Sequence, residues 1–173
     1  MASWSFEALA NDPQCVIACH AVASIEVRIF MPDNFYITAE RCLNAAVALN
    51  ISPTDHKHLA CYLSGYVAEC AAKQIIMVVF SASPKDIKKA FSHGLTALSD
   101  WIQLIALDPA GHSIPLSHLP DFHSDAAQIL AKWNPNNRYS NSCGWDGACS
   151  TNFIGEATSI MTKLAQLRAS GII

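Results

Sequence analysis

The sequence predicts an all-α protein, an antiparallel bundle of four to five core helices. Apolar residues recur at helical spacing along most of the chain. The amphipathic segments, of about 14–26 residues, are joined by short turns, as in antiparallel helical neighbours. No repeat, low-complexity run or linker divides the 173 residues. We therefore predict a single domain over 1–173, with an N-terminal extension at 1–30 and a core at 31–173.

The N-terminal half contains three predicted helices. Residues 13–30 are apolar and should form an extra helical segment, although β-branched residues are frequent there. The helix predicted over 32–49 can be capped by Asp33 or Asn34. Its apolar stripe, with alternating spacings of four and three, is Phe35, Ala39, Cys42, Ala46 and Leu49. A turn then leads into a long helix over 53–80.

The C-terminal half contains shorter elements and one more long helix. A short helical piece follows SASPKD and precedes a helix over 93–107. Three prolines make 108–120 a loop, which is followed by a helix over 121–133. A polar loop then leads to the last helix, over 151–170, with Gly171 placed to end it. The inward positions are Leu95, Leu98, Ile102 and Ile105; Phe122, Ala126, Ile129 and Trp133; and Phe153, Ala157, Ile160, Leu164 and Leu167.

The long helix over 53–80 should face protein on every side. One face carries large apolar residues, and a second face, which includes Gly65, carries small ones. Because Gly costs a helix about 1 kcal/mol relative to Ala, close packing against Gly65 is expected. The third face carries Tyr62, Tyr66, Glu69 and Lys73. Glu69 and Lys73 are spaced to pair, either as a structural ion pair at a helix seam or as the polar centre of a site.

Composition restricts the function classes. The formal charge of −3 argues against generic nucleic-acid binding, but it leaves room for a local basic groove. The N-terminus lacks the pattern of a signal peptide, and the most apolar run is far shorter than the roughly 20 residues that cross a bilayer. Seven cysteines, mostly within helical patterns, are typical of a reducing compartment. We therefore predict a cytoplasmic protein, and the low content of charged residues favours an oligomer.

Motifs of common chemistries are missing from the sequence. It contains no phosphate-binding loop, no dinucleotide-binding glycine motif and no nucleophile elbow. Cys15, Cys19 and His20, like Cys143 and Cys149, lack the paired spacing of zinc ligands. Cys143 and Cys149 are near enough in sequence for a disulfide, which a reducing compartment disfavours. We predict no metal and no cofactor.

Several segments together resemble one protein family. HLACYLSGYVAECAAKQII resembles the YLaGYavEcaLKa helix of HEPN-domain proteins, and NFYITAERCLNAAVAL resembles the helix that precedes it. His93 and Leu95 match a His-x-Leu at the start of the next helix. Trp133, Arg138 and Tyr139 match a W…RY segment before the final helix. The resemblance covers about residues 34–168, and residues 1–30 have no counterpart in it.

The resemblance implies a dimeric helical bundle. Many HEPN proteins act in toxin–antitoxin, anti-phage or RNA-processing systems, and some pair with a small nucleotidyltransferase-like protein. The active ones are metal-independent endoribonucleases whose signature is an Arg followed four to six residues later by His. None of the four arginines here, Arg28, Arg41, Arg138 and Arg168, is followed by such a His. This departure favours a non-catalytic member of the family.

These observations single out two sets of site residues. The catalytic candidates are Arg138, His93 and Glu69, with His93 as proton carrier and Arg138 stabilising charge on a phosphate. His93 is otherwise a helix cap, and Arg138 a loop anchor paired with a buried acid such as Glu69. The ligand-binding candidates are Tyr62, Tyr66, Lys73 and Tyr139.

The expected function is that of a binding or regulatory module in an RNA-related, toxin–antitoxin or defence setting. The expected partners are a second copy of the chain, RNA or a nucleotidyltransferase-like protein. No membrane association is expected. One alternative is a metal-independent endoribonuclease with a non-standard active site. Another is a structural oligomerisation protein, in which the tyrosines only pack a seam.

Overall fold

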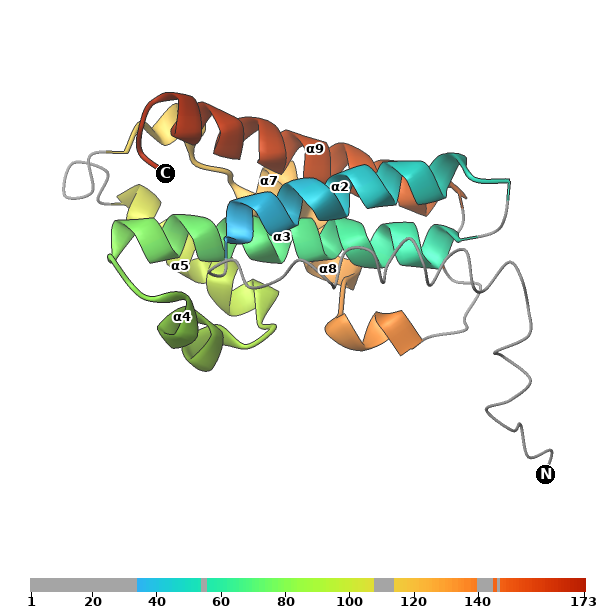
Figure 1. Cartoon of the computed structure of the whole chain (residues 1–173), viewed down its shortest axis with the longest axis horizontal. Coiled ribbons are helices and arrows are strands. Elements are labelled where there is room, and N and C mark those ends of the chain that lie inside the picture. Colours follow the sequence, from blue (N-terminus) through green and yellow to red (C-terminus); the bar gives the residue numbers. More distant parts are fainter. Residues whose placement is uncertain (1–33, 54–55, 108–113, 140–144, 146) are drawn as a thin grey trace. The chain divides into compact units, whose positions relative to one another are not determined.

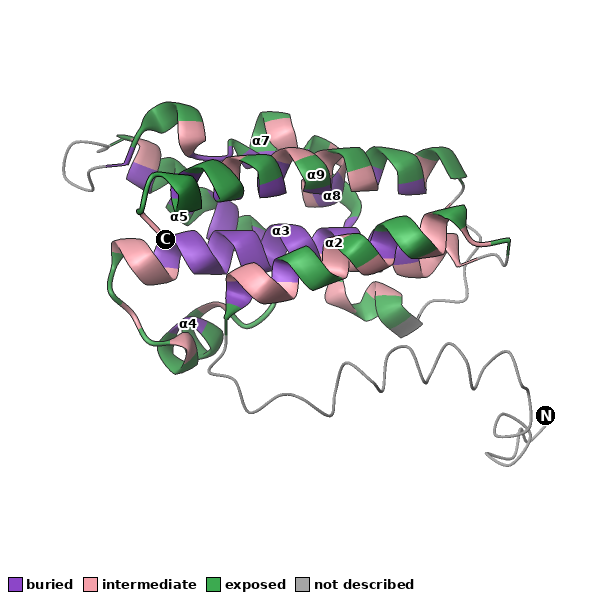
Figure 2. Cartoon of the chain, turned by 45° about the horizontal axis from the view of Figure 1, so that its top comes forward, coloured by how far each residue is buried: buried purple, intermediate pink, exposed green. Residues whose placement is uncertain are grey.

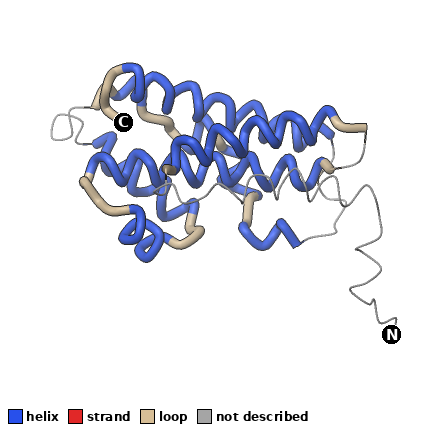
Figure 3. The backbone as a smooth tube through the Cα atoms, viewed as in Figure 1, coloured by secondary structure: helices blue, strands red, loops and turns tan. Residues whose placement is uncertain are grey.

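The computed structural model describes residues 34–53, 56–107, 114–139, 145 and 147–173. Helices, turns and loops make up this part of the chain, and it contains no strand, which confirms the all-α prediction (Figure 3). The chain divides into two units, Met1–Asp33 and Asn34–Ile173. The helix predicted over 13–30 lies outside the described residues. Among the helices that the structure describes, none is both long and apolar enough to cross a membrane.

Three long helices form the body of the unit Asn34–Ile173: α2 (Phe35–Ile51), α3 (Lys57–Val79) and α9 (Gly147–Ala169). The amide of Tyr36, in the first turn of α2, donates to Oε1 of Gln74, near the end of α3, at 3.3 Å. At the other end of α2, Asn50 Oδ1 accepts a hydrogen bond from Ser150 Oγ, at the start of α9, at 2.6 Å. Therefore α2 runs antiparallel to both α3 and α9 (Figure 1).

Helix α3 is the central element. It packs against α2, α9, α4 (Pro84–Phe91), α5 (Leu95–Leu107), α8 (Ala127–Lys132) and the 3-10 helix η3 (Pro135–Tyr139). Most of its residues from Ala60 to Ile76 are buried, as Figure 2 shows. Its small residues lie fully buried at these contacts, as the predicted small-residue face requires.

Local signals explain three of the helix ends. Asn34 caps α2, since its Oδ1 accepts the amide of Ile37 at 3.1 Å, and Ser83 caps α4 by accepting the amide of Asp86 at 3.2 Å. Gly171 ends α9 with φ +71°, a left-handed conformation that favours glycine. The largest differences from the predicted boundaries are at two helix starts: α3 begins at Lys57, a few residues late, and α9 begins at Gly147, four residues early. The ends of α2 and the start of α5 (Leu95–Leu107) differ from the prediction by two or three residues.

The helix predicted over 121–133 is divided in the structure. It forms α7 (Phe122–Asp125) and α8, with a break at Ala126, whose φ is −143°. The carboxylate of Glu156, on α9, accepts the amides of Gln128 and Ile129 at 3.0 and 2.8 Å. This tertiary cap supplies the acceptors that α8 lacks at its start, so the break is satisfied by a residue far along the chain. All four predicted inward positions, Phe122, Ala126, Ile129 and Trp133, are nevertheless buried.

Candidate functional site

The candidate site lies on the side of α3 that faces η3 and the turn between α4 and α5. Tyr62, Tyr66, Glu69 and Lys73 share this side because they are spaced four, three and four residues apart. The turn contributes His93, and η3 contributes Arg138. Helix α3 also packs against α4, α5 and η3, and these contacts bring segments that lie far apart in the sequence to one face.

Glu69 is the polar centre of the cluster. Its side chain is 0% exposed. The ammonium of Lys73 lies 2.6 Å from Glu69 Oε1, and the ring nitrogen His93 Nδ1 lies 3.1 Å from each carboxylate oxygen. A buried carboxylate is costly unless it is paired and hydrogen-bonded, and here it is both. The i, i+4 pairing expected from the spacing of Glu69 and Lys73 is therefore present, and His93 joins it from 24 residues away.

Lys73 is directed inward. Its side chain is 4% exposed, and its ammonium lies 5.9 Å from the centroid of the Phe35 ring. Besides Glu69, Lys73 donates to the backbone carbonyl of Ser92, the residue immediately before His93. This places Lys73 beneath the surface as a support for the cluster.

His93 precedes a helix rather than beginning one. It lies in the turn after α4, and α5 begins two residues later at Leu95. The carbonyl of Gly94 accepts the amide of Leu98, so the first intrahelical bond of α5 starts at Gly94. The helix-cap interpretation of His93 is therefore wrong. Its side chain is 45% exposed and contacts Glu69.

Four rings form a continuous row, which we call the aromatic row: Trp133, Tyr62, Tyr66 and His93. Neighbouring ring centroids are 6.3, 6.4 and 6.4 Å apart in that order. Trp133 is anchored by its indole nitrogen, which donates to the carbonyl of Tyr62 at 3.0 Å. Tyr62 and Tyr66 are half-buried, and the row becomes most exposed at His93.

Arg138 lies beside Tyr62, the second ring of the row. Burial raises the pKa of Tyr62 above its ordinary value, while the nearby Arg138 guanidinium, which also hydrogen-bonds the phenol, acts in the opposite direction. Arg138 is exposed at the surface. Tyr139 ends η3, but its side chain lies outside the described residues, so its predicted role stays a prediction.

Two thiols and one phenol of the row and its surroundings are neutral. Burial raises the pKa of the Cys42 thiol to about 11, and burial also raises the pKa values of Tyr66 and Cys70 far above their ordinary values. These three groups therefore keep their protons at neutral pH. The thiols of Cys42 and Cys70 are therefore poorly suited to nucleophilic chemistry, which needs a lowered pKa.

Spacing alone missed two members of the site. Trp133 is recognisable as an inward residue of its helix, but its place against Gly65 and Tyr62 depends on how that helix crosses α3. Gly65 was the only signal, because a glycine within a helix indicates a close neighbour without identifying it. Phe35, which lies beneath Lys73, gave no signal beyond its apolar stripe.

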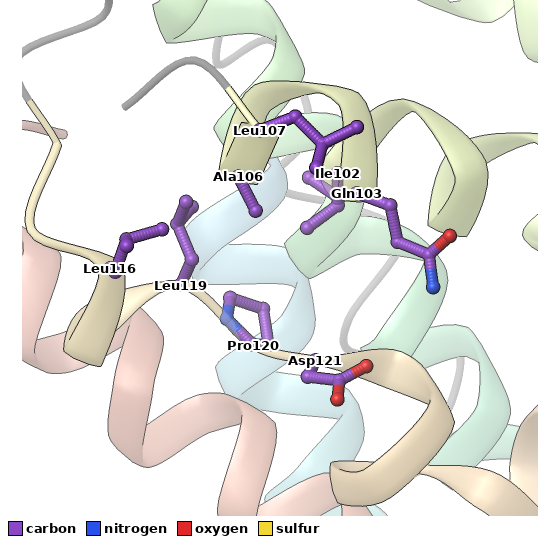
Figure 4. Close-up of a pocket in the computed structure, with 8 residues that line it drawn as sticks. All are labelled: Ile102, Gln103, Ala106, Leu107, Leu116, Leu119, Pro120 and Asp121. Carbon is purple, nitrogen blue, oxygen red and sulfur yellow. The ribbon is translucent and has the colours of Figure 1, made fainter. Parts of the chain in front are cut away.

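A separate groove of about 360 Å³ lies between α5 and the chain around the 3-10 helix η2 (Leu116–His118) (Figure 4). Its lining is mainly apolar, and none of the predicted site residues contributes to it. Among the described residues, no three His, Cys, Asp or Glu side chains are grouped so as to hold a metal ion. Cys143 and the cysteines near the N-terminus lie outside those residues.

Comparisons with protein-family models, curated proteins and solved structures found no match to this chain.

Proposed function

We propose that this chain is a HEPN-like binding module whose aromatic row binds single-stranded RNA, in an RNA-related, toxin–antitoxin or defence setting. The observation that supports this proposal is the row itself, with Arg138 beside it. Every nucleobase has a flat face that stacks on an aromatic ring, and single-strand binders combine such rings with cations that contact the backbone. The family resemblance supplies the biological setting.

The charges of the chain agree with a binding mode led by stacking. The overall charge is −3, so the chain does not attract phosphates by a general excess of cations. Positive charge instead occurs locally, with Arg138 beside the row and the exposed Lys85 and Lys89 on α4, the helix that leads to His93. An arginine is well suited to a phosphate because its fork donates two parallel hydrogen bonds.

The proposal is tested by fluorescence anisotropy with a labelled single-stranded RNA in buffer containing a chelator. Tyr66→Ala should weaken binding roughly tenfold or more, since stacking of one base contributes about 1–3 kcal/mol. Tyr36→Ala is the matched control, because that ring lies on α2 beneath Arg168, 4.5 Å from the guanidinium carbon. An equal effect of the two changes, or no binding by the wild type, would contradict the proposal.

A metal-independent endoribonuclease is the second candidate, and the contact between Glu69 and His93 favours it. A carboxylate that holds one imidazole nitrogen leaves the other free to move a proton. Wild-type protein should then cut single-stranded RNA in the presence of a chelator, and both His93→Ala and Arg138→Ala should abolish the cut. Intact RNA after prolonged incubation with the wild type would exclude this candidate.

The resemblance also supports a homodimer, which we propose as the working assembly. Helix α5 carries apolar side chains that face solvent in the single chain: Trp101 is 40% exposed, Leu104 56% and Leu107 81%. Exposed apolar area of this kind is typical of contact surfaces. Light scattering after size-exclusion chromatography should give twice the chain mass of 18.7 kDa, and Leu104→Asp should lower it.

A further inference from the structure

The contacts of Glu69 determine which of the two ring nitrogens of His93 carries a hydrogen atom. The carboxylate of Glu69 is ion-paired with Lys73 at 2.6 Å, so it acts as a hydrogen-bond acceptor. His93 Nδ1 lies 3.1 Å from both carboxylate oxygens and must therefore be the donor. In the neutral imidazole, the other nitrogen, Nε2, then has no hydrogen and is an acceptor.

The backbone next to His93 is held as firmly as its ring. Ser92 has φ 47° and ψ −111°, a conformation that residues with a side chain rarely adopt. Its carbonyl accepts a hydrogen bond from Lys73, and its amide donates to the carbonyl of Lys88 at 2.9 Å. Lys73 thus fixes His93 twice, through Glu69 and through Ser92. This makes Lys73 a positioning residue, since its buried ammonium has no access to a ligand.

The acceptor nitrogen, Nε2 of His93, lies near the path that the proposed single-stranded RNA would follow. The His93 side chain is 45% exposed, and its ring centroid lies 6.4 Å from that of Tyr66. Because Nδ1 is turned toward buried Glu69, Nε2 lies on the opposite side of the ring. A base stacked on Tyr66 would bring its own sugar, or that of the next nucleotide, to the edge of the imidazole.

We propose that His93 makes this site selective for RNA over DNA, by accepting a hydrogen bond from a ribose 2′-hydroxyl at Nε2. This inference rests on the proposed single-strand binding and deepens it. The 2′-hydroxyl is the group by which a protein distinguishes the two sugars. Deoxyribose offers no donor at this position, and an ionised phosphate oxygen offers none either, so an acceptor at Nε2 favours ribose.

The test compares three labelled strands of one sequence: RNA, DNA and RNA with 2′-fluoro sugars, which retain an RNA-like sugar without a 2′ donor. Wild-type protein should bind RNA roughly three- to tenfold more tightly than either of the others, the range expected for one hydrogen bond. His93→Ala also removes one ring of the aromatic row, so it should lower the affinity for RNA more than the affinities for the other two strands and bind all three equally. Tyr66→Ala should lower the affinity for all three strands by a similar factor.

A second measurement examines the tautomer without any substitution. In ¹⁵N NMR spectra of the intact protein at neutral pH, His93 should show a protonated Nδ1 and an unprotonated Nε2. Glu69→Gln offers His93 an amide donor, so it should reverse the tautomer and remove the preference for RNA. Lys73→Arg, which keeps the charge, should retain more of that preference than Lys73→Met.

The outcomes separate this inference from the function on which it rests. If the wild type binds RNA, DNA and 2′-fluoro RNA equally, RNA selectivity is refuted while single-strand binding stands. Selectivity that survives His93→Ala, or a protonated Nε2 in the wild type, would also refute it. If the wild type binds none of the three strands, both the proposed function and the inference fail.

Discussion

At the scale of single residues, burial decides what an ion pair contributes. Two Lys–carboxylate pairs among the described residues have the same N–O distance of 2.6 Å, Lys73–Glu69 and Lys163–Asp125. In the first pair the side chains are 4% and 0% exposed, and in the second they are 27% and 16% exposed. Removing one partner of a buried pair leaves an uncompensated charge without water, whereas a partly exposed carboxylate regains its hydration.

We therefore predict that Lys73→Met lowers the free energy of unfolding by about 3–5 kcal/mol. The control Lys163→Met makes the same replacement in the more exposed pair. It should lower the free energy of unfolding by about 1 kcal/mol or less. Urea denaturation followed by circular dichroism measures both changes. The double variant Lys73→Met with Glu69→Gln should recover part of the loss, because the carboxylate no longer carries a charge. Equal losses in the two single variants would show that burial is not the deciding factor.

At the scale of elements, the crossing of α8 over α3 shapes the site. A Cβ atom on Gly65 would lie 2.0 Å from Trp133 Cδ1, so the indole occupies the space that any other residue's side chain would fill. Trp133 in turn stacks on Tyr62, the first tyrosine of the aromatic row. Because Gly65 has no side chain, the ring of Trp133 can lie against α3 and reach Tyr62.

We predict that Gly65→Ala destabilises the protein by about 2–4 kcal/mol, although the same change in an open helix stabilises by up to about 1 kcal/mol. Gly155→Ala in α9 is the matched control, since a Cβ atom there meets no heavy atom within 4 Å, and it should be neutral or stabilising. Thermal denaturation measures both variants. A stabilised Gly65→Ala protein would mean that Trp133 does not pack against Gly65 in solution.

The elements also show what the sequence can and cannot reveal. The stripe of α9 and the pairing of Glu69 with Lys73 depend on spacing within one helix, and both were predictable. The break at Ala126 was not, because its acceptors come from Glu156 on another helix. The contact between His93 and Glu69 likewise joins α3 to a distant segment, the turn between α4 and α5. For Arg138 the sequence left a phosphate contact and a loop anchor near a buried acid equally open, and in the structure its guanidinium lies beside the Tyr62 phenol.

At the scale of the whole molecule, the charge distribution determines how the proposed binding responds to salt. The chain carries 11 Lys and Arg against 14 Asp and Glu. Proteins that neutralise many phosphates lose affinity steeply as salt rises, with a slope of log K against log salt of about −0.7 per phosphate contact on a single strand. Stacking releases no counterions and adds nothing to this slope.

We therefore predict a shallow salt dependence, with a slope of about −1.4 to −2.1 for the wild type, corresponding to two or three phosphate contacts. Arg138→Ala should make the slope shallower by about 0.7, because it removes one phosphate contact. Tyr66→Ala should lower the affinity at every salt concentration and leave the slope unchanged. Anisotropy titrations from low to moderate salt measure all three lines. A steep wild-type slope that Arg138→Ala does not alter would place the RNA on another surface, where cations rather than aromatic rings hold the strand.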